Sequence, residues 1–499
     1  MTETQTLPVI GHFLDGRVLE DSARRSPVFD PATGVHQKDV ALADPALVDQ
    51  AVRSAAEAQR AWRRVGLGKR SQVIFKARQI LLARQGELAA AITSEHGKVL
   101  SDAAGEISRG LENVDFCTGL MHHLKGEYAE QVSTGIDVHQ VRQPVGVVAC
   151  ITPFNFPAMI PLWMATTALA AGNAVVLKPS ERDPSVSLLI AQAFKDAGLP
   201  DGLLNVVQGD RVAVDELITH PQIEAISFVG STPIAQSIYV KAAEQGKRVQ
   251  ALGGAKNHMV VMPDAHLDSA ADAAVSAAYG SAGERCMAVS VVVAVGSIAD
   301  DLVQKIRERA EKLTIGPGTD SSSEMGPLVS AEALERVTGY VARAADEGAE
   351  VVLDGRDQQF EGGGYFTGVS LLDHVRPGMK VYDDEIFGPV LCVVRVENYD
   401  EAVELINSSR FANGTALFTR DGKTAREFEF DIEVGMVGVN VPIPVPVGAF
   451  SFGGWKDSLF GDTHMYGPEG FNFYTRRKVV STRWPEPSES QIDLGFPTN

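Results

Sequence analysis

One cysteine, Cys286, stands at the end of a loop of small residues. The loop reads GSAGERC over residues 280–286, and the valine-rich run 289–295 follows it. Small residues let a substrate approach the backbone closely, and the N–H of Cys286 is suited to donate to an oxyanion. A guanidinium favours the thiolate, so Arg285 is expected to activate its neighbour. The loop predicts a thiol nucleophile, and a buried cysteine that only packs is the alternative that the residues leave open.

The other cysteines, Cys117, Cys150 and Cys392, lie within apolar helix or strand patterns and are expected to pack in the core. They are far apart and form no C-x-x-C pair. That spacing favours free thiols in a reducing compartment over disulfides or a zinc site. No metal site is predicted.

Asn155 lies in the loop TPFNFP, residues 152–157, directly after the apolar run 145–151. In a parallel α/β sheet, ligands bind at the carboxyl ends of the strands. A neutral amide donor at that place suits a developing oxyanion. The alternative is a turn asparagine that caps the next helix.

Two further strand ends carry groups that suit a nucleotide. Lys178 and Glu181 belong to KPSE at 178–181, where a lysine and a carboxylate can bond the hydroxyls of a ribose. The carboxylate repels a ribose phosphate, which favours NAD over NADP. The run FVGS, residues 228–231, opens a helix whose backbone N–H groups can meet a pyrophosphate. No G-x-G-x-x-G stands in the right place, and each signal alone also fits an ordinary turn.

The elements that position these groups alternate between helices and short β-branched runs, which is typical of parallel α/β sheets. Polar alternation at 125–142 predicts a hairpin, and FNFYTRRKVVSTRW near the C-terminus predicts a strand that joins it. The expected helices are 70–96, 105–120 and 185–197, and the expected strands are 145–151, 174–177, 204–208 and 225–229, followed in a second unit by 259–262, 289–295, 390–396 and 436–441.

The formal net charge of −19 at pH 7 argues against nucleic acid or an anionic membrane as a partner. The N-terminal residues show no basic and apolar leader pattern, and no stretch is apolar enough to span a membrane. A cytoplasmic protein is therefore expected.

The ordered motifs resemble the aldehyde dehydrogenase superfamily over nearly the whole chain. They are PFNFP at 153–157, KPSE at 178–181, FVGS at 228–231, LGG at 252–254, the loop at 280–286, EIFGP at 385–389 and FGGWKDS at 452–458. The resemblance implies an α/β fold with a Rossmann-like NAD domain (1–122 and 146–252), an α/β catalytic domain (253–450) and a small β oligomerisation arm (123–145 and 470–499). It also implies a homotetramer.

The resemblance further implies roles for individual residues. Cys286 attacks an aldehyde, Asn155 holds the oxyanion, and hydride transfer to NAD leaves a thioester on the sulfur. For Glu385, a solvated charge in the acidic run 382–385 is the alternative. The implied NAD contacts are Thr152, Phe154, Lys178, Glu181, Arg182, Gly230, Ser231, Gly253, Glu385 and Phe387.

One departure narrows the expected reaction. Hydrolytic members carry a water-activating glutamate immediately before LGG, where this chain has Ala251. Without that base, attack by water loses a factor of roughly 10²–10⁴. The thioester then survives until a thiol such as coenzyme A arrives. His258 is expected to be structural rather than a replacement base.

The runs GAKNH (254–258), GERCMAVS (283–290) and SFGGWKDSLFGD (451–462) resemble the CoA-acylating methylmalonate-semialdehyde dehydrogenase branch. That branch implies oxidation and decarboxylation of methylmalonate or malonate semialdehyde to propanoyl-CoA or acetyl-CoA. Arg109 and Arg285 are candidates to bind the substrate carboxylate. The alternatives are an ion pair of Arg109 with Glu106 or Glu112, and a loop-bracing salt bridge of Arg285. Two other functions stay open: hydrolysis of another aldehyde, and a catalytically silent homologue.

Overall fold

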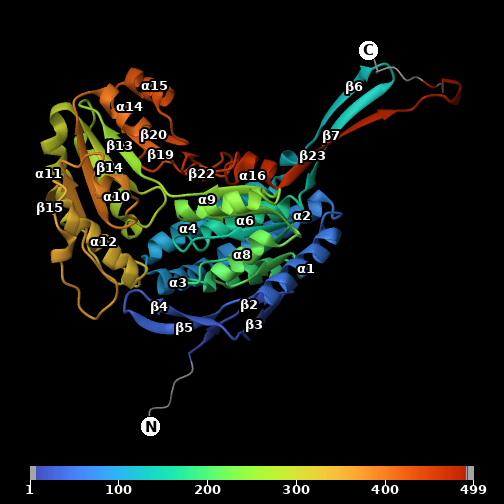
Figure 1. Cartoon of the computed structure of the whole chain (residues 1–499), viewed down its shortest axis with the longest axis horizontal. Coiled ribbons are helices and arrows are strands. Elements are labelled where there is room, and N and C mark those ends of the chain that lie inside the picture. Colours follow the sequence, from blue (N-terminus) through green and yellow to red (C-terminus); the bar gives the residue numbers. More distant parts are fainter. Residues whose placement is uncertain (1–6, 490–491, 493–499) are drawn as a thin grey trace, which may run out of the picture.

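The computed structural model describes residues 7–489 and residue 492, and a long, mainly parallel sheet forms the centre of its first part (Figure 1). Strands β12, β11, β8, β9 and β10 run parallel, with antiparallel β22 at one edge and β2–β3 at the other. The order across the sheet is β22 (Leu459–Phe460), β12 (Arg248–Leu252), β11 (Ile223–Val229), β8 (Val147–Ile151), β9 (Ala174–Lys178), β10 (Leu204–Val206), β2 (His12–Leu14) and β3 (Arg17–Leu19).

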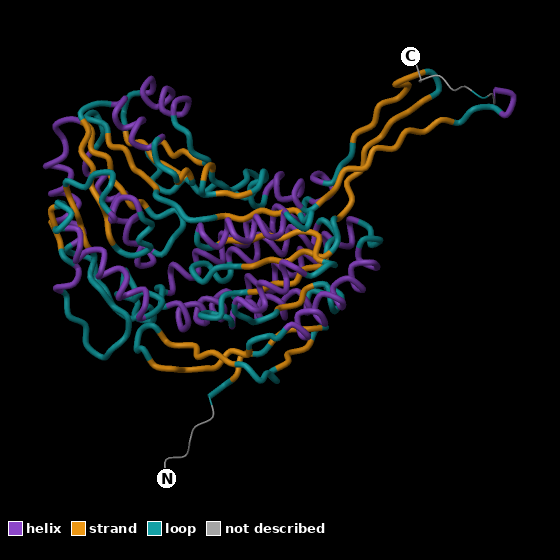
Figure 2. The backbone as a smooth tube through the Cα atoms, in the orientation of Figure 1, coloured by secondary structure: helices purple, strands orange, loops and turns teal. Residues whose placement is uncertain are grey.

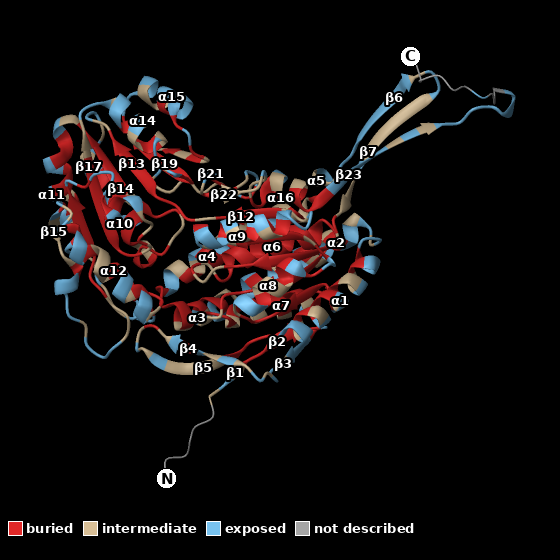
Figure 3. Cartoon of the chain, viewed as in Figure 1, coloured by how far each residue is buried: buried red, intermediate tan, exposed pale blue. Residues whose placement is uncertain are grey.

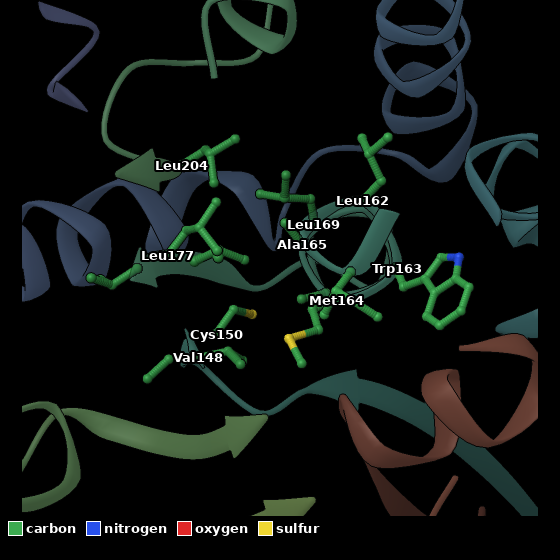
Figure 4. Close-up of a cluster of buried hydrophobic side chains, with 14 of the residues drawn as sticks. Val148, Cys150, Leu162, Trp163, Met164, Ala165, Leu169, Leu177 and Leu204 are labelled. Atoms are coloured by element: carbon green, nitrogen blue, oxygen red, sulfur yellow. The ribbon is translucent and has the colours of Figure 1, made fainter. Parts of the chain in front are cut away.

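Helix α6 (Met159–Ala170) packs between this sheet and another helix. Every residue of α6 is buried, because its sequence MIPLWMATTALA offers no polar face. It packs on β8 and β9 and against α4 (Figure 4). The other helices of this part are α1 (Pro45–Trp62), α2 (Leu67–Ala83), α3 (Gln85–His96), α4 (Leu100–Thr118), α5 (Leu120–His123), α7 (Ser185–Asp196), α8 (Arg211–Thr219) and α9 (Thr232–Ala243).

A second sheet is also parallel except at one edge, where β15 is antiparallel to β16. Its order is β15 (Glu350–Leu353), β16 (Ser370–Asp373), β17 (Val390–Val396), β14 (Val289–Val295), β13 (Asn257–Val261), β19 (Gly414–Phe418) and β20 (Met436–Val439). The helices between these strands are α10 (Leu267–Tyr279), α11 (Ala299–Ala310), α12 (Ala331–Ala344), α13 (Lys380–Asp383), α14 (Tyr399–Asn407) and α15 (Gly422–Asp431). The predicted boundary between residues 252 and 253 falls between β12 and β13, which belong to different sheets.

A three-stranded antiparallel sheet projects from the body as an arm (Figures 2 and 3). The predicted hairpin is β6 (Glu127–Ser133) with β7 (Ile136–Pro144), and the predicted terminal strand β23 (Thr475–Arg483) pairs with β7 along its full length. Residues 490–491 and 493–499 of the predicted arm lie outside the described residues. The remaining elements are β1 (Val9–Ile10), β4 (Arg25–Asp30), β5 (Val35–Ala41), β18 (Phe411–Ala412), β21 (Trp455–Lys456), α16 (Gly467–Phe473), and the short 3₁₀ turns η1 (Gly280–Gly283), η2 (Gly296–Ile298), η3 (Gly355–Asp357) and η4 (Pro487–Glu489).

The predicted helix 70–96 is wrong as a single element. The chain leaves helical geometry at Arg84, which ends α2 and precedes α3. Because of this break, α3 packs along both α4 and β4, whereas α2 packs along α4. The predicted helix 105–120 begins earlier, at Leu100, and ends at Thr118. Among the described residues, no helix is both long and apolar enough to cross a membrane.

A carboxyl group and an imidazole are buried together between the two parts of the molecule. Glu284, in the loop before Cys286, lies 4.0 Å from His96 at the end of α3, and both side chains are almost fully shielded from solvent. Glu284 accepts a hydrogen bond from the Val329 N–H at 3.3 Å through one oxygen. Burial raises the pKa of the Glu284 carboxyl to about 8 and lowers that of His96 well below its ordinary value. Both groups are therefore expected to be neutral at neutral pH.

This burial predicts a pH dependence of stability. In the window between the ordinary carboxyl pKa and about 8, folded Glu284 keeps its proton while the unfolded chain has lost it. The unfolded state binds fewer protons there, so stability falls as pH rises through the window. Glu284→Gln cannot ionise, so its Tm should fall less than that of the wild type between about pH 5 and pH 8. The exposed Glu335→Gln serves as the control, and an unchanged slope in Glu284→Gln would contradict the assignment.

Candidate functional site

A cavity of about 570 Å³ lies at the carboxyl ends of β8, β9, β11 and β12, and residues of the second part close its other side. It brings together both predicted catalytic residues and all ten predicted cofactor contacts. The predicted residues on its wall are Thr152, Phe154, Asn155, Lys178, Glu181, Arg182, Gly230, Ser231, Gly253, Cys286, Glu385 and Phe387.

A hydrogen bond to the backbone of Asn155 holds this residue in place, and its side chain faces the cavity. The Lys98 ammonium donates to the Asn155 carbonyl oxygen at 2.6 Å. The Asn155 side chain is largely buried, lines the cavity and makes no hydrogen bond with another described residue. It does not cap α6, because that helix has no side-chain cap bond. An amide donor faces the cavity, as an oxyanion site requires.

The Cys286 loop makes a tight turn through residues with small side chains. Ser281, Ala282 and Gly283 all adopt left-handed conformations within η1. At Gly283 a Cβ atom would lie only 2.2 Å from the Gly388 carbonyl oxygen, so no other residue fits there. Beyond the turn, the Asn257 side chain donates to the Cys286 carbonyl oxygen at 2.9 Å, which fixes the start of β14.

The Cys286 thiol is partly exposed to the cavity, and the charge of Arg285 favours its thiolate as expected, but burial has the larger effect on its pKa. Burial raises the pKa of the Cys286 thiol to about 12, and the Glu385 carboxylate acts in the same direction. Arg285 lowers this pKa, but its guanidinium is already paired with Asp102. Removal from water therefore outweighs the attraction of one neutralised arginine.

The other three cysteines are buried core residues, as predicted. Cys150 points into the cluster between β8 and α6 (Figure 4). Cys117 lies near the Thr167 hydroxyl of α6, and burial raises its pKa to about 12. Cys286 is thus the only one of the four cysteines that reaches the cavity.

The groups along the first sheet fit a dinucleotide. Lys178 and Glu181 lie side by side, with the ammonium 3.2 Å from the carboxylate, at the end of β9. Helix α9 begins after Ser231, whose side chain makes no cap hydrogen bond, and the N–H groups of Ser231 and Thr232 donate to no described residue, so these two remain for a ligand. At Gly253 a Cβ atom would lie 2.7 Å from the Asp457 carbonyl oxygen, so the backbone stays bare at the cavity wall. A ribose and a pyrophosphate each find suitable partners here.

Glu385 faces the cavity, so the alternative of a solvated surface charge is wrong. Its carboxylate accepts from the Ala255 N–H at 2.9 Å, and burial raises its pKa to about 7. Phe387 follows in a left-handed conformation and presents its ring edge-on to Phe154, with 5.9 Å between ring centroids. These side chains close the cavity beside Cys286.

Both predicted substrate arginines make the ion pairs that the sequence left open as alternatives. Arg109 pairs with Glu112 at 2.8 Å, and Arg285 pairs with Asp102 at 2.7 Å. Neither lines the main cavity, although Arg285 and Cys286 share the wall of a small adjoining one. Burial raises the pKa of the Tyr466 hydroxyl, and the charge of Arg109 acts in the opposite direction. Arg285 is thus the predicted arginine that shares a cavity wall with Cys286.

The position before LGG carries no base. Ala251 is fully buried in β12. His258 is buried in β13, bonds the Tyr382 hydroxyl at 3.0 Å and has its pKa lowered to about 3 by burial. It does not line the cavity, which agrees with the predicted structural role.

The structure adds residues that the sequence interpretation missed. Arg211 and Arg336 also line the cavity. Lys98 and Glu106 lie behind Asn155, fully buried and paired at 2.8 Å. A signal existed for Glu106: it follows Asp102 by four residues and precedes Arg109 by three, so the three charges share one helical face.

Comparison with known proteins shows which family the chain resembles. The family model described as "Aldehyde dehydrogenase family" matches residues 18–480. A relative from Pseudomonas aeruginosa named malonate-semialdehyde dehydrogenase is 54% identical, covering 98% of this chain and 99% of its own. A Geobacillus kaustophilus relative named malonate-semialdehyde dehydrogenase 3 is 47% identical over 97% of this chain and 100% of its own.

Solved structures agree over the same length. The methylmalonate-semialdehyde dehydrogenase of Oceanimonas doudoroffii superposes with a TM-score of 0.96 at 50% identity, over 97% of this chain and 99% of that one. A Sinorhizobium meliloti 1021 protein, crystallised with NAD, gives a TM-score of 0.96 at 50% identity over 97% of this chain and 100% of its own. With the match of family model, relatives and fold, the chain belongs to the aldehyde dehydrogenase family.

Proposed function

We propose that this protein is an NAD-dependent, CoA-acylating dehydrogenase that oxidises and decarboxylates malonate and methylmalonate semialdehyde. The products are acetyl-CoA and propanoyl-CoA, with NADH and carbon dioxide. The observation that carries the proposal is a cysteine and an amide donor on one cavity wall, with buried Ala251 where a hydrolytic enzyme keeps its base. The names of the similar enzymes favour the same substrates.

The first half of the reaction forms a thioester on Cys286. The sulfur gives its proton to solvent and bonds to the aldehyde carbon, and the side-chain amide of Asn155 with the N–H of Cys286 stabilises the oxyanion that forms on the former carbonyl oxygen. Bound NAD would supply the hydride acceptor that the oxidation needs. Lys178 and Glu181 would hold a ribose, Gly230 and Ser231 a pyrophosphate, and Glu385 with Phe387 the nicotinamide end. Thr152, Phe154, Arg182 and Gly253 complete that wall.

The second half transfers the acyl group to CoA. Loss of carbon dioxide from the carboxylated acyl group leaves an enolate, which the same oxyanion donors stabilise until it takes up a proton. The thiol of CoA then bonds to the acyl carbon, and Cys286 leaves as its thiol or thiolate. Water competes poorly in this step, because Ala251 has no proton acceptor and His258 is turned away toward Tyr382.

The arginines suit a substrate with a carboxylate. Arg109 is engaged with described residues only through Nη1, and Arg285 only through Nη2. The remaining guanidinium donors of both are available for a second carboxylate, and the existing pairs hold the side chains in place. Glu112 and Asp102 thus orient the arginines.

The exposed arm supports a homotetramer built from dimers. Its outer strands β6 and β23 each leave one edge without a partner strand in the described chain. Such edges extend a sheet when another copy supplies a strand. We propose residues 123–145 and 470–499 as the oligomerisation arm, beside an NAD-binding domain (1–122 and 146–252) and a catalytic domain (253–450).

A hydrolytic dehydrogenase is the second candidate, because Glu385 has its pKa raised to about 7 and faces the cavity with Cys286. A carboxylate with that pKa is able to act as a general base for water. The product of the second half-reaction separates the two candidates.

The nucleophile is tested by replacement. Cys286→Ala should abolish NADH formation from malonate semialdehyde, since no other cysteine reaches the cavity. Cys392→Ala, in the core of the second sheet, should keep activity in the folded protein. Wild-type rates in Cys286→Ala would instead indicate a silent homologue or another nucleophile.

The acceptor is tested by omitting CoA. Without CoA, malonate semialdehyde should give one NADH per active site and then stop, because the thioester persists. Ala251→Glu should restore turnover with free acid as product, by a gain within roughly 10²–10⁴-fold. Ala251→Gln, of equal size but without a base, is the control. Full turnover of the wild type without CoA, with free acid released, would contradict CoA acylation.

The arginines are tested by comparing aldehydes. Each charge-assisted bond contributes about 1.5–3 kcal/mol, so Arg109→Leu or Arg285→Leu should lower kcat/KM for malonate semialdehyde by about 10- to 150-fold. For propanal, which has no carboxylate, the loss should stay below about 3-fold. Arg78→Leu is a matched control, because Arg78 of α2 pairs with Asp115 of α4, the helix of Arg109, and does not line the cavity. Equal losses with both aldehydes would rule out carboxylate binding.

A further inference from the structure

A buried ion pair lies directly behind the loop that carries Asn155. The Lys98 ammonium is 2.8 Å from one oxygen of the Glu106 carboxylate, and both side chains are about 1% exposed. The same ammonium donates to the Asn155 carbonyl oxygen at 2.6 Å and lies 4.6 Å from the centre of the Phe156 ring. Lys98 therefore contacts two neighbouring residues of the β8–α6 loop.

The second oxygen of Glu106 binds the other end of the same loop. It accepts hydrogen bonds from the Ala158 N–H at 2.8 Å and the Met159 N–H at 3.1 Å, where α6 begins. These amides would otherwise be unsatisfied, because no side chain caps α6 locally. A carboxylate from α4 supplies the cap, so the ion pair bonds residues 155, 158 and 159 of one short segment.

This arrangement constrains Asn155 in a particular way. Its backbone carbonyl is bonded on the buried side, whereas its side chain lines the cavity and has no partner among the described residues. An oxyanion donor stabilises a transition state only when it is already oriented, since reorientation during the reaction costs free energy. A charged pair in a buried site is a stiff anchor, because breaking either contact leaves an unpaired charge away from water.

Helix α4 also contacts the loop that carries Cys286. Asp102, one turn before Glu106, pairs with Arg285 beside Cys286. Successive turns of one helix thus contact the loop of the amide donor and the loop of the thiol.

We propose that Lys98 and Glu106 are positioning residues for the reaction: their ion pair holds the amide of Asn155 at the place where the oxyanion forms. This inference rests on the part of the proposed function that makes Asn155 the oxyanion donor. It does not depend on CoA or on the arginines, so propanal is a suitable test aldehyde.

The experiment measures the NADH burst with propanal in Glu106→Gln, Asn155→Ala and the combined variant. Glu106→Gln should lower the burst rate at least about 10-fold, approaching the about 10²–10³-fold lost when such a donor is removed. The affinity for NAD, measured by fluorescence titration, should change less than about 3-fold, since the ion pair bonds the backbone of Asn155, Ala158 and Met159 and not that of the NAD contacts Thr152 and Phe154. In the Asn155→Ala background, Glu106→Gln should have little further effect, because the two residues act as one unit.

Two further variants separate positioning from folding. Lys98→Met combined with Glu106→Gln removes both charges without leaving one unpaired, so it should fold even if Glu106→Gln alone does not, and its burst should be equally slow. Asp373→Asn removes the buried carboxylate that pairs with the partly exposed Arg395 in the second sheet and should lower Tm without slowing the burst. Hydrogen exchange at residues 155–159 should be faster in the Lys98 and Glu106 variants than in Asn155→Ala.

The results separate the positioning role of Lys98 and Glu106 from the oxyanion role of Asn155. A normal burst in the folded double-charge variant, or full additivity with Asn155→Ala, would overturn the positioning role and leave the proposed reaction intact. A normal burst in Asn155→Ala itself would overturn the oxyanion role, and the inference would fall with it.

Discussion

The ion pair between Arg285 and Asp102 crosses from the loop of the nucleophile to helix α4 in the first part of the chain. Cys286 precedes a strand of the second sheet, whereas Asn155 follows a strand of the first, and in the proposed reaction both must reach one carbonyl group. Contacts between the two parts of the chain, such as this ion pair, set the position of the Cys286 loop relative to the Asn155 loop. A second contact nearby, from the Leu100 N–H to the Gly318 carbonyl oxygen at 3.1 Å, joins the start of α4 to the second part. The geometry of the whole cavity depends on this junction.

Burial controls the electrostatics on both sides of the junction. It raises the pKa of Cys286 to about 12 and of Glu385 to about 7, and it lowers that of His258 to about 3. In the free protein these groups are therefore biased toward their neutral forms. Glu385 lines the same cavity as Cys286, whereas position 251 carries an alanine. In the reaction that we propose, this alanine favours attack on the thioester by an external thiol over attack by water.

Much of the fold could be predicted because doubly buried parallel strands are nearly continuous runs of valine and isoleucine. The runs at 289–295 and 390–396 match β14 and β17 to the residue. The apolar residues of 70–96 continue past Arg84, and the glycine near the break, Gly86, lies inside α3, so the pattern predicts one helix. The break is decided by the packing of α3 against β4, which is distant in sequence, and against α4, which follows α3 in the chain. How strongly Arg285 favours the Cys286 thiolate also depends on a distant contact, because the partner of Arg285 lies 183 residues away.

Local patterns in the sequence were sufficient to identify the main candidate residues. These are Cys286 in a loop of small residues, Asn155 and Lys178 at the ends of strands, and an alanine in place of a base. These depend on residue type and on neighbours along the chain, which are visible without coordinates. Which charges are neutralised, which side chains face the cavity and how Asn155 is anchored depend on contacts between residues such as Lys98, Glu106 and Met159. Only the folded chain brings those groups together, because burial and distance are properties of three-dimensional packing rather than of sequence spacing.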